Sequence, residues 1–182
     1  MQSPDDKPVL ILAGPPGAGK TTAARVLAER SERAVHIESD RFFQFIRSGF
    51  VEPWRPESAE QNEVVMRVVA GAAAAYASAG YFTIVDGIVL PRFFFEPLRD
   101  ALREAGHEVA YAVLRAPLDV CLARAGSRDS RPLGDPLVVE RLWRGFADLG
   151  PLSPHAVDVD AKDPQAAADL LDVRIRDRSL RA

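Results

Sequence analysis

The chain has 182 residues, of which 47% are hydrophobic and 27% charged, a balance typical of one globular domain with a sizeable core. Its formal net charge of −3 gives no bulk attraction to nucleic acid or to an anionic membrane, and its single cysteine, Cys121, excludes an internal disulfide and a cysteine-based metal cluster. The first eight residues are polar, unlike a secretory signal, and no apolar run is long enough to span a bilayer, so we expect a cytoplasmic protein.

Residues 14–21 carry the most informative pattern, G-x-x-x-x-G-K-S/T, which is typical of the phosphate-binding loop of nucleoside triphosphate enzymes. A short apolar run at 9–13 predicts a buried parallel strand before it, and helix formers at 22–30 predict a helix after it. In this context we expect Lys20 to reach the β- and γ-phosphates and the Thr21 hydroxyl to ligate Mg²⁺. We therefore expect ATP to bind through Gly14, Pro15, Pro16, Gly17, Ala18, Gly19, Lys20, Thr21 and Thr22.

Strand and helix signals alternate along the rest of the chain, as in an α/β domain with a parallel sheet. Further strands are predicted at 34–38, 82–86, 108–114 and 156–160. Helices are predicted at 41–47, 57–79, 93–105, 117–125, 137–149 and 164–173, with Ser58 as the N-cap of the second. The whole of 1–182 is expected to form one domain, with flexible ends at about 1–7 and 174–182.

The residues Glu38-Ser39-Asp40 stand at the C-terminal end of the second predicted strand. Ligands of an open parallel sheet lie at the carboxyl ends of its strands, and the phosphate loop lies at that same edge. Asp40 can therefore face the γ-phosphate from the acceptor side and accept the proton of a substrate hydroxyl. The alternative is that Asp40 caps the following helix, a role that Ser39 can fill equally well.

Asp86 ends the third predicted strand, in the pattern of a carboxylate that helps to hold Mg²⁺, usually through water. The pattern is weak alone, because many buried strands end in aspartate, but its place at the active edge of the sheet supports the metal role as much as a structural one. Whether Asp86 or Glu38 contacts the metal stays open. Arg92, a few residues further on, could face the acceptor or could simply begin a helix in solvent.

A polar segment rich in glycine and proline spans residues 126–136. It is either a solvated loop or a mobile lid that carries arginines to the transferred phosphate. Arg124, Arg128 and Arg131 are the candidates to stabilise transition-state charge, and the first two would share a helix face if the preceding helix continued.

Two groups of aromatic residues follow strand ends at the predicted active edge, at 42–54 and 93–95. Some must belong to the core, but together they indicate an apolar acceptor pocket, in which we place Phe43 and Trp54 beside Asp40 and Arg92. The histidines His36, His107 and His155 occur singly, without the spacing of metal ligands, and we assign them no role.

On the loop at 14–21, the pair Ser39-Asp40, the strand-ending Asp86 and the arginines of 124–131, the chain resembles the small P-loop kinases over residues 9–171. Within that group it is most similar to the chloramphenicol phosphotransferase-like and zeta-toxin-like ATP-dependent kinases. The resemblance implies a three-layer fold, a five-stranded parallel sheet in the order 2-3-1-4-5 with helices on both faces, and a short lid. It also implies that Asp40 activates an acceptor hydroxyl.

The sequence as a whole predicts an enzyme that uses ATP and Mg²⁺ to phosphorylate a hydroxyl of a small molecule. The signatures of nucleoside monophosphate, shikimate and gluconate kinases are not evident, so the acceptor stays open among antibiotics, nucleosides, sugar nucleotides and other metabolites. Two alternatives remain: a nucleotide-binding switch with slow hydrolysis, and a polynucleotide 5′-hydroxyl kinase, against which the net charge of −3 argues.

Overall fold

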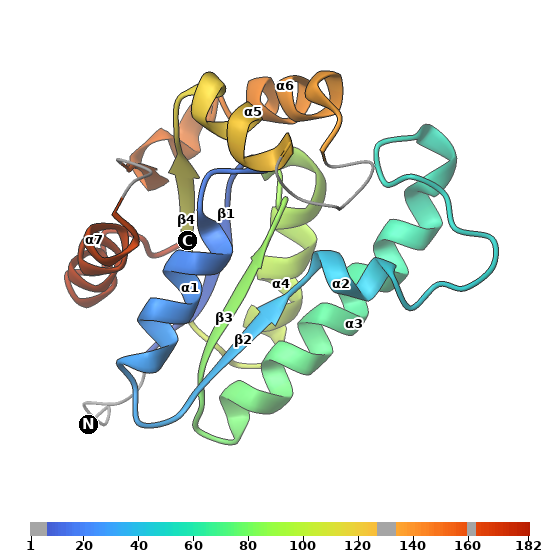
Figure 1. Cartoon of the computed structure of the whole chain (residues 1–182). Coiled ribbons are helices and arrows are strands. Elements are labelled where there is room, and N and C mark those ends of the chain that lie inside the picture. The colour runs from blue at the N-terminus through green and yellow to red at the C-terminus, as the bar shows by residue number, and fades with distance from the viewer. Residues whose placement is uncertain (1–6, 127–133, 160–162) are drawn as a thin grey trace.

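The protein is built on a five-stranded, all-parallel sheet (Figure 1). The structure is a computed structural model and describes residues 7–126, 134–159 and 163–182. The strands run β2-β3-β1-β4-β5 across the sheet, which confirms the predicted order. Their bounds are β1 Val9–Ala13, β2 Ala34–Glu38, β3 Phe82–Gly87, β4 Val109–Arg115 and β5 Ala156–Asp158.

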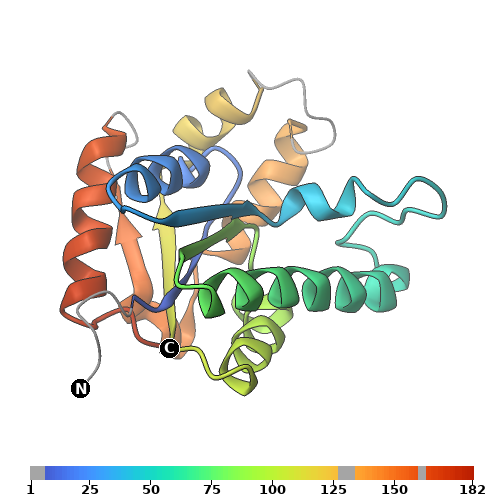
Figure 2. The same cartoon turned by 90° about the horizontal axis from the view of Figure 1, so that it is seen from below.

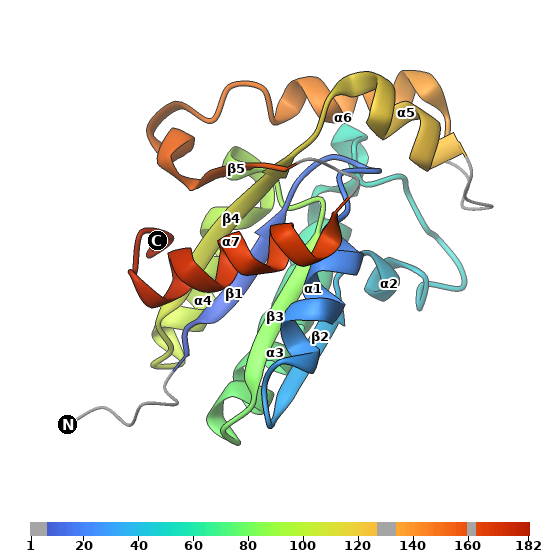
Figure 3. The same cartoon turned by 60° about the vertical axis from the view of Figure 1, so that its left-hand side comes forward.

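Helices cover both faces of the sheet, as expected (Figures 1 and 2). Helices α1 (Lys20–Glu29) and α7 (Pro164–Arg176) lie on one face, and α3 (Ala59–Ser78) and α4 (Glu96–Glu104) lie on the other. Figure 3 shows α5 (Leu118–Gly126) and α6 (Pro136–Gly145) together above the carboxyl ends of the strands. Short elements complete the fold: α2 (Asp40–Phe43), the 3₁₀ turns η1 (Pro56–Ser58) and η3 (Gly150–His155), and the π-helical turn η2 (Pro91–Phe95).

The central strand β1 separates two hydrophobic clusters. All five of its residues are buried, because helices cover both faces. Leu10 and Leu12 pack into the cluster beneath α1 and α7, whereas Val9 and Ile11 pack into the cluster against α3 and α4. This alternation follows from the two-residue period of a strand. Cys121 is fully buried in the first cluster, where its thiol packs as part of the core.

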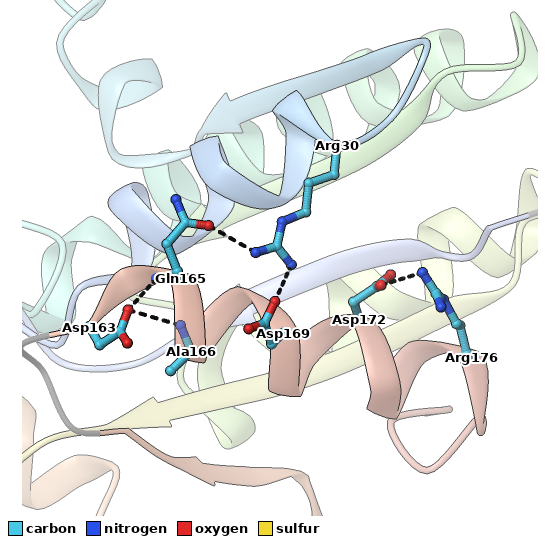
Figure 4. A network of polar contacts seen from close by, with 7 residues as sticks. All are labelled: Arg30, Asp163, Gln165, Ala166, Asp169, Asp172 and Arg176. Atoms are coloured by element: carbon cyan, nitrogen blue, oxygen red, sulfur yellow. Dashed lines mark hydrogen bonds and ion pairs between the residues drawn. The ribbon is translucent and has the colours of Figure 1, made fainter.

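Helix α7 is bound to the C-terminal end of α1 by a polar network (Figure 4). Arg30 forms an ion pair with Asp169 at 2.7 Å and donates a hydrogen bond to Gln165 Oε1 at 2.9 Å. Asp163 caps α7 by accepting the backbone N–H groups of Gln165 and Ala166. The helix that begins with Lys20 is thus supported at its far end by a second helix.

The C-terminal tail differs from the expectation that residues 174–182 would fray. Leu180 is fully buried, its carbonyl accepts the N–H of Tyr111 at 2.8 Å, and the N–H of Ala182 donates to the carbonyl of Val109 at 3.0 Å. The reason is the shortness of β5, which pairs only with residues 113–115 of β4. The tail pairs antiparallel with the remaining edge of β4 and satisfies backbone groups there.

The predicted helix at 137–149 is shorter, since α6 ends at Gly145. The first three residues of the helix predicted at 93–105 belong instead to the π-helical turn η2, and α4 begins at Glu96. Among the residues described, no helix has the length and apolar character needed to cross a bilayer.

Candidate active site

The phosphate-binding loop joins β1 to α1, and three of its glycines adopt backbone conformations that other residues rarely adopt. The φ angles are +148° at Gly14, +81° at Gly17 and +95° at Gly19. A Cβ atom on Gly14 would lie 2.4 Å from the carbonyl oxygen of Leu114, and one on Gly17 would lie 2.4 Å from that of Cys121. The loop therefore needs glycine both for its turns and for its close packing against β4 and α5.

The start of α1 is arranged to receive an anion. Gly19 holds the N-cap position with no side-chain cap, and the first turn contains no acidic residue. The first N–H groups of a helix lack intrahelical partners and carry the positive end of the helix dipole, so this end suits a phosphate group. Thr21 lies half-buried in this turn and Thr22 is exposed, while Pro15, Pro16 and Ala18 are buried in the loop.

Two cationic side chains lie at this loop. Lys20 is buried, and its ammonium group donates hydrogen bonds to the carbonyl oxygens of Gly14 at 2.9 Å and Pro15 at 3.0 Å. Arg124 reaches the loop from α5, and its Nη1 lies 3.7 Å from the point where a Cβ atom on Gly19 would stand. Both cations are therefore close to the place where phosphates would bind.

Most of the predicted lid cannot be compared with the structure. Arg128 and Arg131 fall within 127–133, outside the described residues. Helix α5 is described as far as Gly126, so the expected helix face common to Arg124 and Arg128 also lies outside the described residues. Beyond the gap, Asp135 caps α6 by accepting the N–H of Leu137 at 2.9 Å.

Asp40 is the first residue of α2 and lies against the carboxyl end of β3. Ser39, not Asp40, holds the N-cap position, and it makes no side-chain capping bond. The Asp40 carboxylate instead accepts the backbone N–H of Ile88. A Cβ atom on Gly87 would lie 1.9 Å from Ser39 Oγ and 3.5 Å from Asp40 Oδ1, so the lack of a side chain at Gly87 permits this close approach.

The charges around Asp40 connect it to the phosphate loop. Burial raises the pKa of the Asp40 carboxyl above its ordinary value of 3.8. The positive charge of Lys20 and the hydrogen bond from Ile88 act in the opposite direction, while the negative charges of Asp86 and Glu38 raise the pKa further. Asp40 and Lys20 therefore interact electrostatically within one site.

Asp86 lies at the end of β3, level with Leu12 of β1 and Glu38 of β2. Its buried carboxylate accepts a hydrogen bond at 2.7 Å from Nε2 of His36. Our interpretation of the sequence assigned His36 no role. The signal that could have found it is its position two residues before Glu38, which puts both side chains on the same face of β2.

The donor set at this edge fits a magnesium ion that arrives with a nucleotide. Within 7–126, 134–159 and 163–182, no group of three or more His, Cys, Asp or Glu side chains could hold a metal ion. Mg²⁺ keeps several waters and is usually held by one or two carboxylates together with substrate phosphates, so it needs no such cage. The Thr21 hydroxyl and the Asp86 carboxylate offer the oxygen ligands that it prefers.

A cavity of about 570 Å³ opens beside Asp40. Its walls come from α2 and the loop after it, from the segment after β3, and from α6. The lining residues are Asp40, Phe43, Gln44, Ile46, Phe50, Pro53, Trp54, Ile88, Leu90, Phe93, Phe94, Arg141, Leu142 and Gly145. Phe43 and Trp54 both line this cavity together with Asp40. The side chain of Arg92 is outside the described part of the structure, and the wall formed by α6 was missed.

Hydrogen bonds to α3 and its N-terminal turn fix the loop that forms one wall. The side-chain amide of Gln61 accepts the N–H of Val51 at 2.9 Å and donates to its carbonyl at 2.7 Å. The carbonyl of Pro53 accepts hydrogen bonds from Ser58 Oγ at 3.0 Å and Asn62 Nδ2 at 2.8 Å. Ser58 therefore occupies the expected N-cap position of α3 but uses its hydroxyl to anchor this loop.

A buried tyrosine fixes the second wall. Tyr111 on β4 is fully buried, and its hydroxyl donates to the carbonyl of Val89 at 2.9 Å. Its ring stacks on Phe95 with a centroid separation of 4.0 Å. Since Val89 lies between two lining residues, Ile88 and Leu90, this wall is held from within the core.

Comparison with known proteins identifies the family of the part of the chain that carries these site residues. A family model described as an AAA domain, AAA_33, matches residues 9–148, which include the loop, Asp40 and Asp86. The chain is a small P-loop kinase of the AAA_33 family. This confirms the predicted resemblance to the small P-loop kinases.

One relative of this P-loop kinase matches it over most of its length. It is 32% identical to a shikimate kinase of Pseudomonas fluorescens over 176 residues, covering 90% of this chain and 94% of that protein. Two other curated relatives match in part, because the chain spans only 20% and 56% of their lengths.

Solved structures share the fold at lower identity. A tunicamycin resistance protein of Deinococcus radiodurans is similar with a TM-score of 0.70 and 23% identity, over 93% of this chain and 95% of that one. A sugar kinase of Janibacter sp. HTCC2649 is similar with a TM-score of 0.68 and 21% identity, over 92% of this chain and 93% of that one. At these identities the likeness shows the fold alone.

Proposed function

We propose that this P-loop kinase transfers the γ-phosphoryl group of ATP to a hydroxyl group of a small molecule, with Asp40 as the base. The observation that carries the proposal is the position of Asp40, which interacts with the charge of Lys20 and also lines the cavity. A nucleotide on the loop and an alcohol in the cavity would meet at this carboxylate.

In the proposed step, the acceptor oxygen forms a bond to the γ-phosphorus while its proton passes to Asp40. The bond from that phosphorus to the bridging oxygen of the β-phosphate breaks, and ADP leaves. The raised pKa of Asp40, which burial causes, supports this role because it makes the carboxylate a stronger base than an exposed one.

The phosphates need positive charge as the bond breaks. Lys20 and Arg124, both at the loop, are proposed to supply it, together with Arg128 and Arg131 from the predicted lid. Mg²⁺ neutralises phosphate charge when it is bound, and Thr21 and Asp86 are the residues that would hold it. A nucleic-acid acceptor is disfavoured, because the described cavity wall is largely apolar and would leave phosphates unpaired.

The test is acceptor-dependent formation of ADP by the purified chain across hydroxylated antibiotics, nucleosides and sugars. Lys20→Ala should abolish it, whereas Lys7→Ala should not, since Lys7 bonds to Ser31 away from the loop. A nucleotide-binding switch would instead hydrolyse ATP slowly and at the same rate with every acceptor. That outcome, or full activity in Lys20→Ala, would contradict the proposal.

A further inference from the structure

The cavity beside Asp40 is mostly apolar. Of its fourteen lining residues, three carry a charge or a side-chain amide, namely Asp40, Gln44 and Arg141. The other eleven are aliphatic, aromatic, proline or glycine residues. A polyhydroxylated ligand would bury many hydroxyl groups against this wall without partners, at a cost for each one.

The charges of the wall also disfavour an anionic ligand. A carboxylate or phosphate that leaves water needs a fixed cationic partner. Among the described side chains of the lining, Arg141 is the one basic residue, and it is exposed. At the end of the cavity where transfer would occur, Asp40 adds a negative charge, and the ammonium of Lys20 beside it is held at the phosphate loop, where the nucleotide would use its charge. A neutral molecule meets neither penalty.

Aromatic rings stand partly in solvent at this cavity. Phe50 and Phe93 line it while 46% and 61% exposed, and Phe94 packs edge-on against Phe93 with ring centroids 5.7 Å apart. An apolar body that covers these rings removes apolar surface from water on both partners. The wall itself is anchored by the bonds to Pro53 and Val89, so the site is largely formed before a ligand enters.

We propose that the acceptor is an uncharged alcohol with an aromatic or other flat apolar body, which Phe43, Trp54 and Phe93 cover while its hydroxyl lies at Asp40. The placement of the hydroxyl rests on the proposed kinase function, whereas the preference for a neutral apolar body rests on the wall. A cavity of about 570 Å³ suits a ligand of the size of a small drug.

The preference for a neutral ligand with an apolar body is tested by measuring ligand binding, with no ATP present. The full chain is loaded with the neutral fluorescent probe N-phenyl-1-naphthylamine and titrated with 1-naphthalenemethanol or with 1-naphthoate, which share a ring system but differ in charge. The alcohol should displace the probe at least about tenfold more tightly than the carboxylate. Equal displacement, a preference for the carboxylate, or no binding of either neutral compound would overturn the proposal.

A matched pair of variants locates the binding. Phe93→Asp and Phe45→Asp each place a carboxylate on an exposed phenylalanine position, and only Phe93 lines the cavity. Phe93→Asp should weaken binding of the alcohol by about fivefold or more, and Phe45→Asp by less than about twofold. Equal effects of the two substitutions would place the binding elsewhere and contradict the proposal.

ADP formation separates this inference from the proposed function. Tight binding of the alcohol, with no ADP formed from any alcohol tested, would support the apolar preference and contradict the kinase proposal. ADP formed only with carboxylated or phosphorylated acceptors would support the kinase proposal and contradict the apolar preference.

Discussion

His36 donates a hydrogen bond of 2.7 Å from Nε2 to Oδ2 of Asp86, and the two side chains are 12% and 5% exposed. The residues come from the neighbouring strands β2 and β3, so the bond is fixed by the sheet itself. A histidine N–H that bonds one carboxylate oxygen limits rotation of that group and so orients its other oxygen.

We predict that His36→Ala raises the Mg²⁺ concentration needed for ATP binding by about tenfold or more, because Asp86 loses the partner that orients it. His36→Gln, which keeps a side-chain N–H, should lose less. The measurement is a Mg²⁺ titration of the thermal stabilisation by ATP. His107→Ala is the control, since His107 bonds to Ser78 in the segments that precede β4 and β3, near the amino ends of these strands. An unchanged Mg²⁺ requirement in His36→Ala would show that His36 does not position Asp86.

Alanine substitutions at Gly87 and Gly71 test whether the close approach of α2 to β3 requires glycine at position 87. Gly87→Ala would force Ser39, which is 1% exposed, away from β3 and carry Asp40 with it, so it should cost about 1–3 kcal/mol of stability and reduce transfer. Gly71 lies on α3 in open space, and Gly71→Ala should add up to about 1 kcal/mol without affecting transfer. Thermal unfolding of both variants checks this. A Gly87→Ala protein as stable and active as the parent would contradict the predicted clash.

Asp40 should reduce stability at neutral pH. Burial raises the pKa of its carboxyl in the folded state, so ionising Asp40 costs more free energy in the folded protein than in the unfolded one. Below pH 3.8 the carboxyl is protonated in both states and this cost is absent; the cost grows, and stability is lost, as the pH rises through the raised pKa. The charges facing it act in both directions: Lys20 favours the ionised form, while Asp86 and Glu38 disfavour it. Asp40→Asn should therefore raise the free energy of unfolding at pH 7, and the gain should shrink toward acid pH.

The measurement is denaturant unfolding of the parent and of Asp40→Asn at a series of pH values from 7 down to 3.8. The transfer rate of the parent should fall over the same range, because a protonated carboxyl cannot accept the hydroxyl proton. A stability difference that is constant with pH would contradict the assigned cause.

The strands and the phosphate loop were predictable because their signals are local. The run at 9–13 and the motif at 14–21 specify a buried strand and a turn without reference to the rest of the chain. Asp40 and Asp86 could be placed at one edge, because parallel strands end together. The spacing of His36 and Glu38 puts both side chains on one face of β2, but the bond between His36 and Asp86 depends also on the register of β2 against β3, which no local pattern of residues contains.

The rest of the site depends on packing between distant segments. Phe43 and Trp54 were identified because they follow a strand end, whereas Arg141 and Leu142 were not, since the position of α6 over the cavity is a tertiary contact. The tail was expected to fray on its charged composition, but the free edge of β4 that binds it appears only once β5 is known to be short. The likeness to a shikimate kinase likewise spans the chain, although its signatures are not evident in the sequence.

The most direct test of the central claim is single-turnover phosphoryl transfer by Asp40→Asn, measured beside its affinity for ATP. Asparagine keeps the size of the side chain but cannot take the hydroxyl proton. The rate of transfer should fall by about 10²–10⁴-fold, while the dissociation constant for ATP stays within about twofold of the parent value. Transfer at the parent rate, or a loss of ATP affinity equal to the loss of rate, would contradict the assignment of Asp40 as the base.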